Sequence, residues 1–456
     1  MNASGWVVAL LLILVVGIAG FSWVRAEGEL PELLGPEALV VGRGGADLAI
    51  ETSDWDSGLR SLRVTIAPQG EAAAEADGDS GREHVLVDES FHGNLLSGGV
   101  RNEHAVELKL DAEKLADVKS PATLRIAVRD WSWRGGFGGN EALRLVPLTI
   151  DVDPPRITVN SGLTYVRQGG SGSVAYRISE ETERDGVRVG DIEFRGYPMP
   201  GGKPNDRIAL FAIPIGGDPD APVRVFAEDA AGNASDAGWS LVVKPHPQPT
   251  GQVRLSHSFM QMVVPRLAPT GASADPADAF RDINTRLRTA NEEQIRKLVA
   301  DSAPEPLFSG GLHQLAGSKV TSRFGERRTY YADEKPVSEA VHYGYDLASF
   351  AAAPVTAAAG GRVVHADDLG IYGNCVIVDH GLGLTTLYGH LSRIDVKVGE
   401  KVAKDERVGL TGATGLAGGD HLHFAVLVGD TYVDPLEWWD AKWVETHVAS
   451  NLPLAR

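Results

Sequence analysis

The sequence predicts a mainly β protein that follows a single N-terminal membrane helix. Residues 6–24 are almost entirely apolar, as expected for a helix that crosses a bilayer. From residue 39 onward, short runs rich in Val, Ile and Leu are separated by Gly-containing turns. A helical period of apolar residues appears after Asp275. We therefore expect two β-sandwich modules, a short helical linker and a C-terminal antiparallel β domain.

The N-terminal apolar segment, which we assign to residues 1–26, has two interpretations. About 20 apolar residues span a bilayer, and Trp6 and Trp23 suit its two interfaces. A signal peptide needs basic residues before the apolar run, and residues 1–5 have none, although Val24-Arg25-Ala26 resembles a cleavage site. The length favours a retained anchor.

Two β-rich stretches follow, which we assign to residues 27–152 and 153–245 and which meet at Asp153-Pro154-Pro155. The first contains alternating runs such as 61–66 and 124–128, and the second contains a similar run at 223–227. Each stretch ends with a strand, an acidic residue, a Gly-containing turn and a further strand. This pattern resembles a degenerate tandem of immunoglobulin-like sandwiches. Such modules are spacers or docking surfaces, and the spacer is the simpler interpretation.

A linker and helical arm, residues 246–318, come next. Residues 244–249 alternate proline with polar residues, which predicts a stiff, extended break between domains. Asp275-Pro276 is an N-cap followed by proline at the first helical position, and Asn291 is expected to start a second short helix. A helical brace packed on the C-terminal domain is the simpler interpretation. A regulatory arm over the substrate groove is the alternative.

His421-Leu422-His423 is the most informative motif of the chain. Residues i and i+2 of a strand point to the same face, so the two imidazoles should enter one site while Leu422 faces the core. Earlier in the chain, His342 and Asp346 add an imidazole and a carboxylate four residues apart. Two imidazoles, a carboxylate and an open position for water make a hydrolytic zinc site. The remaining histidine would be a fourth ligand or a proton carrier.

The sequence around this motif predicts β-structure throughout. His390 stands at the end of one predicted strand, and the Gly-rich residues 411–419 lead almost directly into His421. Strands are expected near residues 362–364, 375–378, 384–388 and 424–428. We assign residues 319–440 to an antiparallel β domain, in which a groove lined by turns would suit an extended peptide.

Ten motifs in a fixed order resemble the lysostaphin-like (LytM-type) zinc metallopeptidases, which cut peptide cross-links in bacterial cell walls. The resemblance covers residues 319 to 439, about a quarter of the chain. Its motifs are Thr321-Ser322-Arg323-Phe324-Gly325, His342 to Asp346, Pro354-Val355, Gly361-Arg362-Val363-Val364, Tyr372-Gly373-Asn374, Asp379-His380-Gly381, Tyr388-Gly389-His390-Leu391, Val398-Gly399, Gly412-Ala413-Thr414-Gly415 and His421-Leu422-His423-Phe424.

The resemblance implies a role for each site residue. His342, Asp346 and His423 would bind one Zn²⁺ per catalytic domain. His421 would be the general base that activates the zinc-bound water, and His390 would stabilise the oxyanion. An imidazole with a pKa near ~6.5 can accept a proton from water and return it to the leaving amine.

The sequence departs from the family at two positions. Ala340 replaces the usual Arg two places before the first ligand, and Ala353 replaces the usual Gly before Pro-Val. Neither is a ligand, although losing the Arg changes how the first ligand is held. Some relatives have lost ligands and only activate other wall hydrolases. We therefore keep a second hypothesis, a catalytically silent scaffold that binds wall peptides or activates a separate amidase.

The other residues of these types are interpreted as structural. His380 is expected in a hairpin turn and His365 at a packing or surface position. Cys375 is the single cysteine, so it forms no internal disulfide and is expected to be buried.

Charge and resemblance together predict partners and location. The net charge of −18 argues against nucleic acid as a partner. The resemblance implies peptidoglycan stem peptides as substrate, with the N-terminal helix in the inner membrane and the catalytic domain in the periplasm. A cleaved helix would instead release the protein to the envelope. Arg25 opposes this orientation by the positive-inside rule, which the family argument overrides. Envelope proteins that regulate the chain are a further expected partner class, and residues 441–456 are assigned to a tail.

Overall fold

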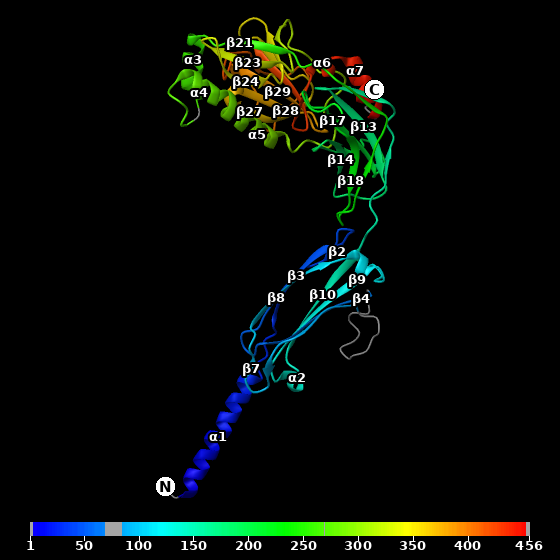
Figure 1. Cartoon of the computed structure of the whole chain (residues 1–456), viewed down its shortest axis with the longest axis vertical. Coiled ribbons are helices and arrows are strands. Elements are labelled where there is room, and N and C mark those ends of the chain that lie inside the picture. Colours follow the sequence, from blue (N-terminus) through cyan, green and yellow to red (C-terminus); the bar gives the residue numbers. More distant parts are fainter. Residues whose placement is uncertain (1–2, 69–83, 269, 453–456) are drawn as a thin grey trace. The chain divides into compact units, whose positions relative to one another are not determined.

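The computed structural model describes residues 3–68, 84–268 and 270–452, which form two compact units (Figure 1). The first comprises residues 1–154 with 228–233, and the second comprises the remaining residues. The protein is mainly β, with an N-terminal helix and a β-rich C-terminal domain, as predicted. The finer division into six segments stays a prediction.

Helix α1 (Ala3–Arg25) opens the first unit. Its stretch from Trp6 to Arg25 is the one helix among the described residues that is long and apolar enough to cross a membrane. The end of α1 is tied to the β-structure that follows. The Arg25 guanidinium donates to the carbonyl oxygens of Trp131 (2.7 Å) and Leu95 (3.3 Å), and the Arg25 carbonyl accepts from the Trp133 N–H (2.7 Å).

A β-sandwich forms the rest of the first unit. Alternating side chains of its two sheets, such as Leu48, Ile50, Leu62 and Ile126, fill a common core. Its sheets are β1–β3–β8 and β2–β10–β9–β4–β5, and its elements are β1 (Glu32–Leu34), β2 (Leu39–Val41), β3 (Ala46–Ser53), β4 (Leu59–Pro68), β5 (His84–Ser90), β6 (Gly93–Asn94), β7 (Gly98–Gly99), β8 (Glu103–Leu110), η1 (Ala112–Leu115), β9 (Ala122–Asp130), α2 (Arg134–Phe137) and β10 (Glu141–Ile150).

A second sandwich begins the second unit. Its sheets are β11–β13–β17–β16, β12–β20 and β15–β14–β18–β19. Their strands are β11 (Ile157–Val159), β12 (Thr164–Arg167), β13 (Ser171–Ile178), β14 (Arg184–Val189), β15 (Ile192–Arg195), β16 (Tyr197–Pro198), β17 (Asp206–Ala212), β18 (Val223–Glu228), β19 (Ala234–Ala237) and β20 (Leu241–Lys244).

The second sandwich shares one hydrophobic core with the C-terminal domain. Arg167 donates to Asp434 (2.7 Å) and Glu437 (3.0 Å), and the indole of the fully buried Trp438 donates to Ser171 (3.0 Å). This sandwich is therefore packed against the domain that carries the predicted site.

A large sheet dominates the C-terminal domain, in the order β22–β25–β33–β29–β28–β27–β31, with β34 paired to β33. Two three-stranded sheets, β21–β23–β24 and β26–β32–β30, flank it. The strands are β21 (Thr250–Arg254), β22 (Lys319–Ser322), β23 (Arg327–Ala332), β24 (Lys335–Val341), β25 (Tyr345–Ala348), β26 (Pro354–Thr356), β27 (Gly361–Asp368), β28 (Asn374–Asp379), β29 (Leu384–Leu391), β30 (Arg393–Ile394), β31 (Lys401–Val402), β32 (Arg407–Leu410), β33 (Leu422–Val428) and β34 (Thr431–Val433).

Most helices of this unit precede or follow the large sheet in sequence, and η3 lies between two of its strands, β27 and β28. They are α3 (His257–Leu267), α4 (Pro276–Asp282), the π-helical η2 (Ile283–Leu287), α5 (Arg288–Val299), η3 (Gly370–Tyr372), α6 (Pro435–Trp439), α7 (Ala441–His447) and η4 (Ala449–Asn451). α7 and η4 pack against the second sandwich, where Ser173 donates to the His447 carbonyl (2.6 Å). Within the predicted tail, residues 453–456 lie outside the described residues.

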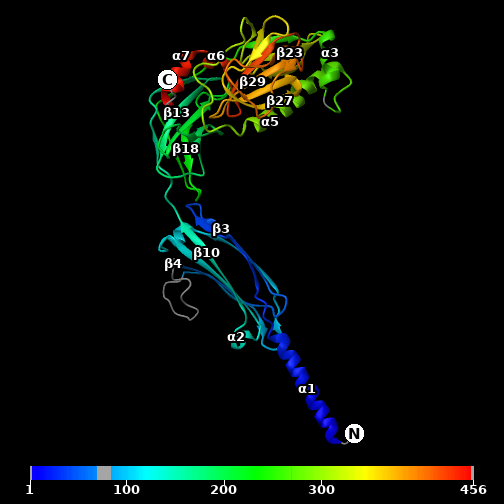
Figure 2. The ribbon, with the colours of Figure 1, turned by 180° about the vertical axis from the view of Figure 1, so that it is seen from behind.

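The helical arm differs from the prediction in one respect. Asp275 caps α4 as expected, and its side chain accepts from the Ala277 and Asp278 N–H groups. The second helix start expected at Asn291 is wrong, because α4, η2 and α5 run on continuously and Asn291 lies inside α5. Its buried side chain instead accepts from the Ile371 N–H (3.0 Å). α5 thus packs along the C-terminal domain, as Figure 2 shows from behind, which supports the brace interpretation.

His380 is fully buried and hydrogen-bonded on both ring nitrogens, to the Gly360 carbonyl and to Thr386 Oγ1 (both 2.7 Å). Burial lowers its pKa from 6.5 to about 4. The unfolded chain therefore binds this proton more readily, so stability present above pH 6.5 is lost as the pH falls towards 4. We expect about 3 kcal/mol of this loss between pH 7 and pH 4 to come from His380. His380→Gln should show a shallower pH dependence of thermal unfolding in calorimetry, and an unchanged slope would contradict this account.

Candidate metal centre and active site

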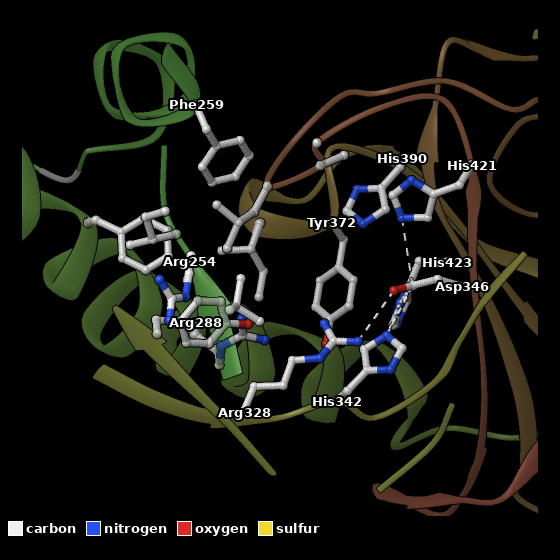
Figure 3. A pocket seen from close by; sticks show the side chains of 18 of the residues that line it. Arg254, Phe259, Arg288, Arg328, His342, Asp346, Tyr372, His390, His421 and His423 are labelled. Atoms are coloured by element: carbon white, nitrogen blue, oxygen red, sulfur yellow. Dashed lines mark hydrogen bonds and ion pairs between the residues drawn. The ribbon is translucent and has the colours of Figure 1, made fainter. Parts of the chain in front are cut away.

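A pocket of about 440 Å³ in the C-terminal domain brings together all five residues predicted from the sequence (Figure 3). These are His342, Asp346, His390, His421 and His423. Leu422, between the last two, is buried in the core, as the strand alternation predicts.

Three of these side chains converge on one point. His342 Nε2 and His423 Nδ1 each lie 3.0 Å from Asp346 Oδ1, and the two nitrogens are 3.2 Å apart. Ligands at about 2.0–2.1 Å from a tetrahedral ion are separated by roughly 3.3 Å. The three atoms therefore have the spacing of a three-ligand face on a metal ion, and they are one of the clusters in the described chain that could hold one.

Local structure explains this convergence. Asp346 on β25 and His423 on β33 are directly paired across antiparallel strands. His342 follows β24, and its Nδ1–H donates to the Arg323 carbonyl (2.9 Å), which directs Nε2 towards Asp346. Gly344 lies against the His423 ring, since a Cβ there would come within 2.7 Å of it. A residue without a side chain is needed between the first two predicted ligands.

His421 and His390 lie beside the triad. Their rings are 4.8 Å apart between centroids, and His421 Nε2 is 3.7 Å from Asp346 Oδ1. His421 donates Nδ1–H to the Gly419 carbonyl, and His390 donates Nδ1–H to the Thr414 carbonyl (both 2.8 Å). A carbonyl can only accept, so in both rings Nδ1 carries a proton and Nε2 is left for substrate or water.

A β-bulge aims His390 at the site. The pairing of β28 with β29 shifts by one residue between Val376↔Tyr388 and Asn374↔Leu391. His390 lies in the extra length of β29 and has a φ of 64°, in the left-handed region. Bulges re-aim side chains next to active sites, and strained backbone clusters there.

The charge states suit metal binding. Burial opposes ionisation of Asp346, but His342 and His423 outweigh it and hold the pKa of this carboxyl well below its usual range. Burial lowers the pKa of His423 to about 4, and burial together with the His421 and His423 imidazoles lowers that of His390 to about 3. At neutral pH the Asp346 carboxylate is therefore charged and the His423 imidazole is neutral, which are the states that ligate a metal. The His390 imidazole beside them is neutral as well.

Arg328 was missed by the sequence analysis. It lies on β23 directly opposite Ala340, the position at which the family resemblance leads us to expect Arg. Its guanidinium lies 3.5 Å from Asp346 Oδ2 and also donates to Glu326 (2.8 Å) and Ser322. Arg328 on the neighbouring strand therefore contacts the Asp346 carboxylate, which the short side chain of Ala340 cannot do. No sequence signal indicated this, because the contact depends on strand pairing.

Tyr372 was also missed, although its Tyr-Gly-Asn motif was part of the resemblance. Its ring lies 5.5 Å from that of His423, and its hydroxyl donates to Glu292 on α5 (2.8 Å). Burial raises its pKa well above the usual value, so the phenol stays neutral. The helical arm thus holds a residue that lines the pocket.

Comparison with known proteins identifies this domain. A family model described as peptidase family M23 matches residues 340–435, which include all five site residues. The C-terminal domain belongs to peptidase family M23. The predicted LytM-type assignment is thereby confirmed for this part of the chain.

Relatives of the M23 domain are named as peptidases, and one of them is named as a peptidoglycan DD-endopeptidase. It is 38% identical over 112 residues to the peptidoglycan DD-endopeptidase ShyA of Vibrio cholerae, covering 24% of this chain and 25% of that protein. It is 32% identical over 127 residues to the DD-carboxypeptidase/endopeptidase Mpg of Neisseria meningitidis, covering 27% and 28%. The catalytic domain of lysostaphin from Staphylococcus simulans is 28% identical with a TM-score of 0.25, covering 29% of this chain and 98% of that domain. The chain thus matches about a quarter of the length of these curated relatives.

Proposed function

We propose that this chain is a zinc-dependent endopeptidase that hydrolyses peptide cross-links of bacterial peptidoglycan. The observation that carries the proposal is the convergence of His342 Nε2, Asp346 Oδ1 and His423 Nδ1 within 3.2 Å of one another, with two further histidines beside them. The M23 match and the names of the relatives supply the reaction class and the substrate. Because these relatives are named DD-peptidases, we propose the D,D cross-link as the bond that is cut.

The donor set fits Zn²⁺. His342, Asp346 and His423 offer two imidazole nitrogens and one carboxylate oxygen, a combination found in catalytic zinc sites that keep a fourth position open. When bound there, zinc lowers the pKa of a coordinated water to about 7 and polarises the carbonyl group of the substrate.

The remaining histidines supply proton transfer and oxyanion stabilisation. His421 presents the lone pair of Nε2 to the pocket, so it is assigned as the general base that takes a proton and returns it to the leaving amine. His390 presents Nε2 beside it and is assigned to the oxyanion. It is neutral in the free protein, so it becomes a donor there only after gaining a proton, which a negatively charged oxygen favours.

Arg328 is assigned to hold Asp346 in place for zinc. Arg328→Lys keeps the positive charge but loses the planar fork, and second-shell changes of this kind weaken metal binding by about 10- to 100-fold. We expect that loss in a competition titration against a chromophoric chelator. Arg327→Lys is the matched control, because Arg327 is the exposed neighbour of Arg328 and hydrogen-bonds Gln248 instead of Asp346. Equal zinc affinity in wild type and Arg328→Lys would contradict this assignment.

The location is proposed as the inner membrane, with α1 retained as a single anchor and the catalytic domain in the periplasm. The length and apolarity of α1 support an anchor. Arg25, the last residue of α1, supports an uncleaved helix, because it is buried and hydrogen-bonded to the first sandwich. Peptidoglycan would then be reached from the membrane side. Envelope regulators remain an expectation.

The test is digestion of purified peptidoglycan by the full chain in detergent. The digestion is run once with added zinc and once with chelator. The soluble products are then separated and identified by mass spectrometry. The proposal predicts that cross-linked dimers fall and monomers rise only when zinc is present. Bound zinc with unchanged cross-linking would instead favour the silent scaffold.

A further inference from the structure

One wall of the catalytic pocket comes from residues that precede the M23 match. Val253, Arg254, Leu255, Ser256, Phe259, Phe280 and Arg288 line the pocket together with the histidines. Figure 3 draws Arg254, Phe259 and Arg288 at one end and the histidines at the other, with Arg328 and Tyr372 between. We name Arg254, Phe259, Phe280 and Arg288 the linker wall.

The linker wall is built into the domain. β21 pairs in parallel with β23, and the register places Arg254 opposite Tyr331. Phe280 is fully buried and packs its ring against Tyr330 at 5.4 Å and Phe259 at 6.5 Å between centroids. A small core that includes Met260, Val263 and Ala332 ties α3 and α4 to this sheet. The wall is therefore a fixed part of the pocket.

The charge of the pocket is opposite to that of the chain. The chain carries 61 acidic and 43 basic side chains. Among the described residues that line the pocket, Arg254, Arg288 and Arg328 are the cations, and Asp346 is the one carboxylate. Asp346 is engaged by His342 and His423, and Arg328 pairs with Glu326. This arrangement favours an anionic ligand.

Of the arginines that line the described pocket, Arg288 is the one without an ion pair. Arg254 pairs with Glu334, but no carboxylate of the described chain lies within ion-pair distance of Arg288. Its Nε and one Nη donate to Asn284 Oδ1 (3.2 and 2.8 Å). Asn284 is buried and donates to Ser338 Oγ (2.9 Å), which fixes the amide orientation.

The helix geometry adds to this preorganisation. Asn284 lies in the π-helical turn η2, and Arg288 is the first residue of α5 after it. Single π-helical turns occur frequently at functional sites. A half-buried guanidinium that is held by a neutral amide has its remaining N–H donors available for a ligand.

We propose that Arg288 forms a subsite for a free carboxylate of the substrate peptide, away from the scissile bond. The inference rests on the proposed function, since it takes the histidine end of the pocket as the place of hydrolysis. A guanidinium binds a carboxylate through two parallel hydrogen bonds. The subsite selects cross-linked peptides that keep that carboxylate over amidated ones.

The test measures binding without turnover. Full-length His421→Ala protein in detergent is titrated calorimetrically with a cross-linked muropeptide dimer, and with the same dimer after its free carboxyls are converted to carboxamides. We expect the carboxyl form to bind roughly 10- to 100-fold more tightly, the effect of a charge-assisted contact. Adding Arg288→Gln should remove this preference, whereas Arg288→Lys should keep part of it. The control is Arg286→Gln, which removes an exposed arginine of the same turn that pairs with Asp282. This variant should keep the full preference for the carboxyl dimer.

Two outcomes would overturn the subsite: equal binding of both dimers, or a preference that survives Arg288→Gln. Thermal unfolding of each variant establishes that the fold is retained. Failure of the subsite is distinguishable from failure of the proposed function. A carboxyl preference removed by Arg288→Gln supports the subsite even in a chain that cleaves nothing, and cleavage without such a preference supports the function alone.

Discussion

Asp346→Asn should abolish both zinc binding and peptidoglycan cleavage. The substitution keeps the size of the side chain but replaces the carboxylate, whose Oδ1 lies 3.0 Å from both ligand nitrogens, with a neutral amide. Protein zinc sites bind with about 10–16 kcal/mol, so losing one of three ligands costs about 4 kcal/mol, or roughly 1000-fold in affinity. Zinc content after dialysis, measured by atomic emission, checks this.

Asp420→Asn is the matched control for this variant. Asp420 directly precedes His421, but its carboxylate accepts from Thr411 Oγ1 and the Ala352 N–H, away from the three ligand atoms. It should keep stoichiometric zinc. A chain with Asp346→Asn that retains zinc with wild-type affinity would show that the ion sits elsewhere.

His421→Ala should separate catalysis from metal binding. His421 Nε2 is 3.7 Å from Asp346 Oδ1, farther than the nitrogens of His342 and His423, and the ring is partly exposed to the pocket. Loss of a general base lowers kcat by about 100- to 10 000-fold. We expect that loss with zinc stoichiometry unchanged, measured as the rate of muropeptide cleavage under saturating substrate.

The control for His421→Ala is His313→Gln, which removes an exposed histidine paired with Asp405 outside the pocket. It should cleave at the wild-type rate. If His421→Ala lost zinc as well as activity, the residue would be a fourth ligand, the alternative that the H-x-H motif alone leaves open.

Local patterns predicted how the residues within each histidine motif are oriented, whereas the family resemblance predicted that the distant motifs share one site. Strand alternation puts Leu422 in the core and its two neighbours in one pocket, and the spacing of His342 and Asp346 needs only a short turn around Gly344. The cap at Asp275 is likewise local, because the side chain bonds to N–H groups two and three residues on. Patterns of this kind are encoded within a few residues.

Contacts between distant segments were not predictable in this way. Arg328 reaches Asp346 from a position opposite Ala340 because β23 pairs with β24, and nothing near Ala340 in sequence indicates this contact. The alternation of proline with polar residues at 244–249 predicted an extended break between domains, and it did not indicate that β21, directly after it, would pair with β23 beside the site. The local pattern at Asn291 predicted a helix start, but its side chain instead accepts a hydrogen bond from the loop that carries Tyr372. In each case tertiary pairing overrides the local signal.

The most direct test of the central claim is a zinc titration of the metal-free full chain, followed by cleavage of a cross-linked muropeptide. The account predicts that activity rises in proportion to bound zinc and saturates at one ion per chain, and that His421→Ala binds the same zinc without cleaving. Full zinc occupancy of the wild-type site with no cleavage, or cleavage that persists without zinc, would contradict it.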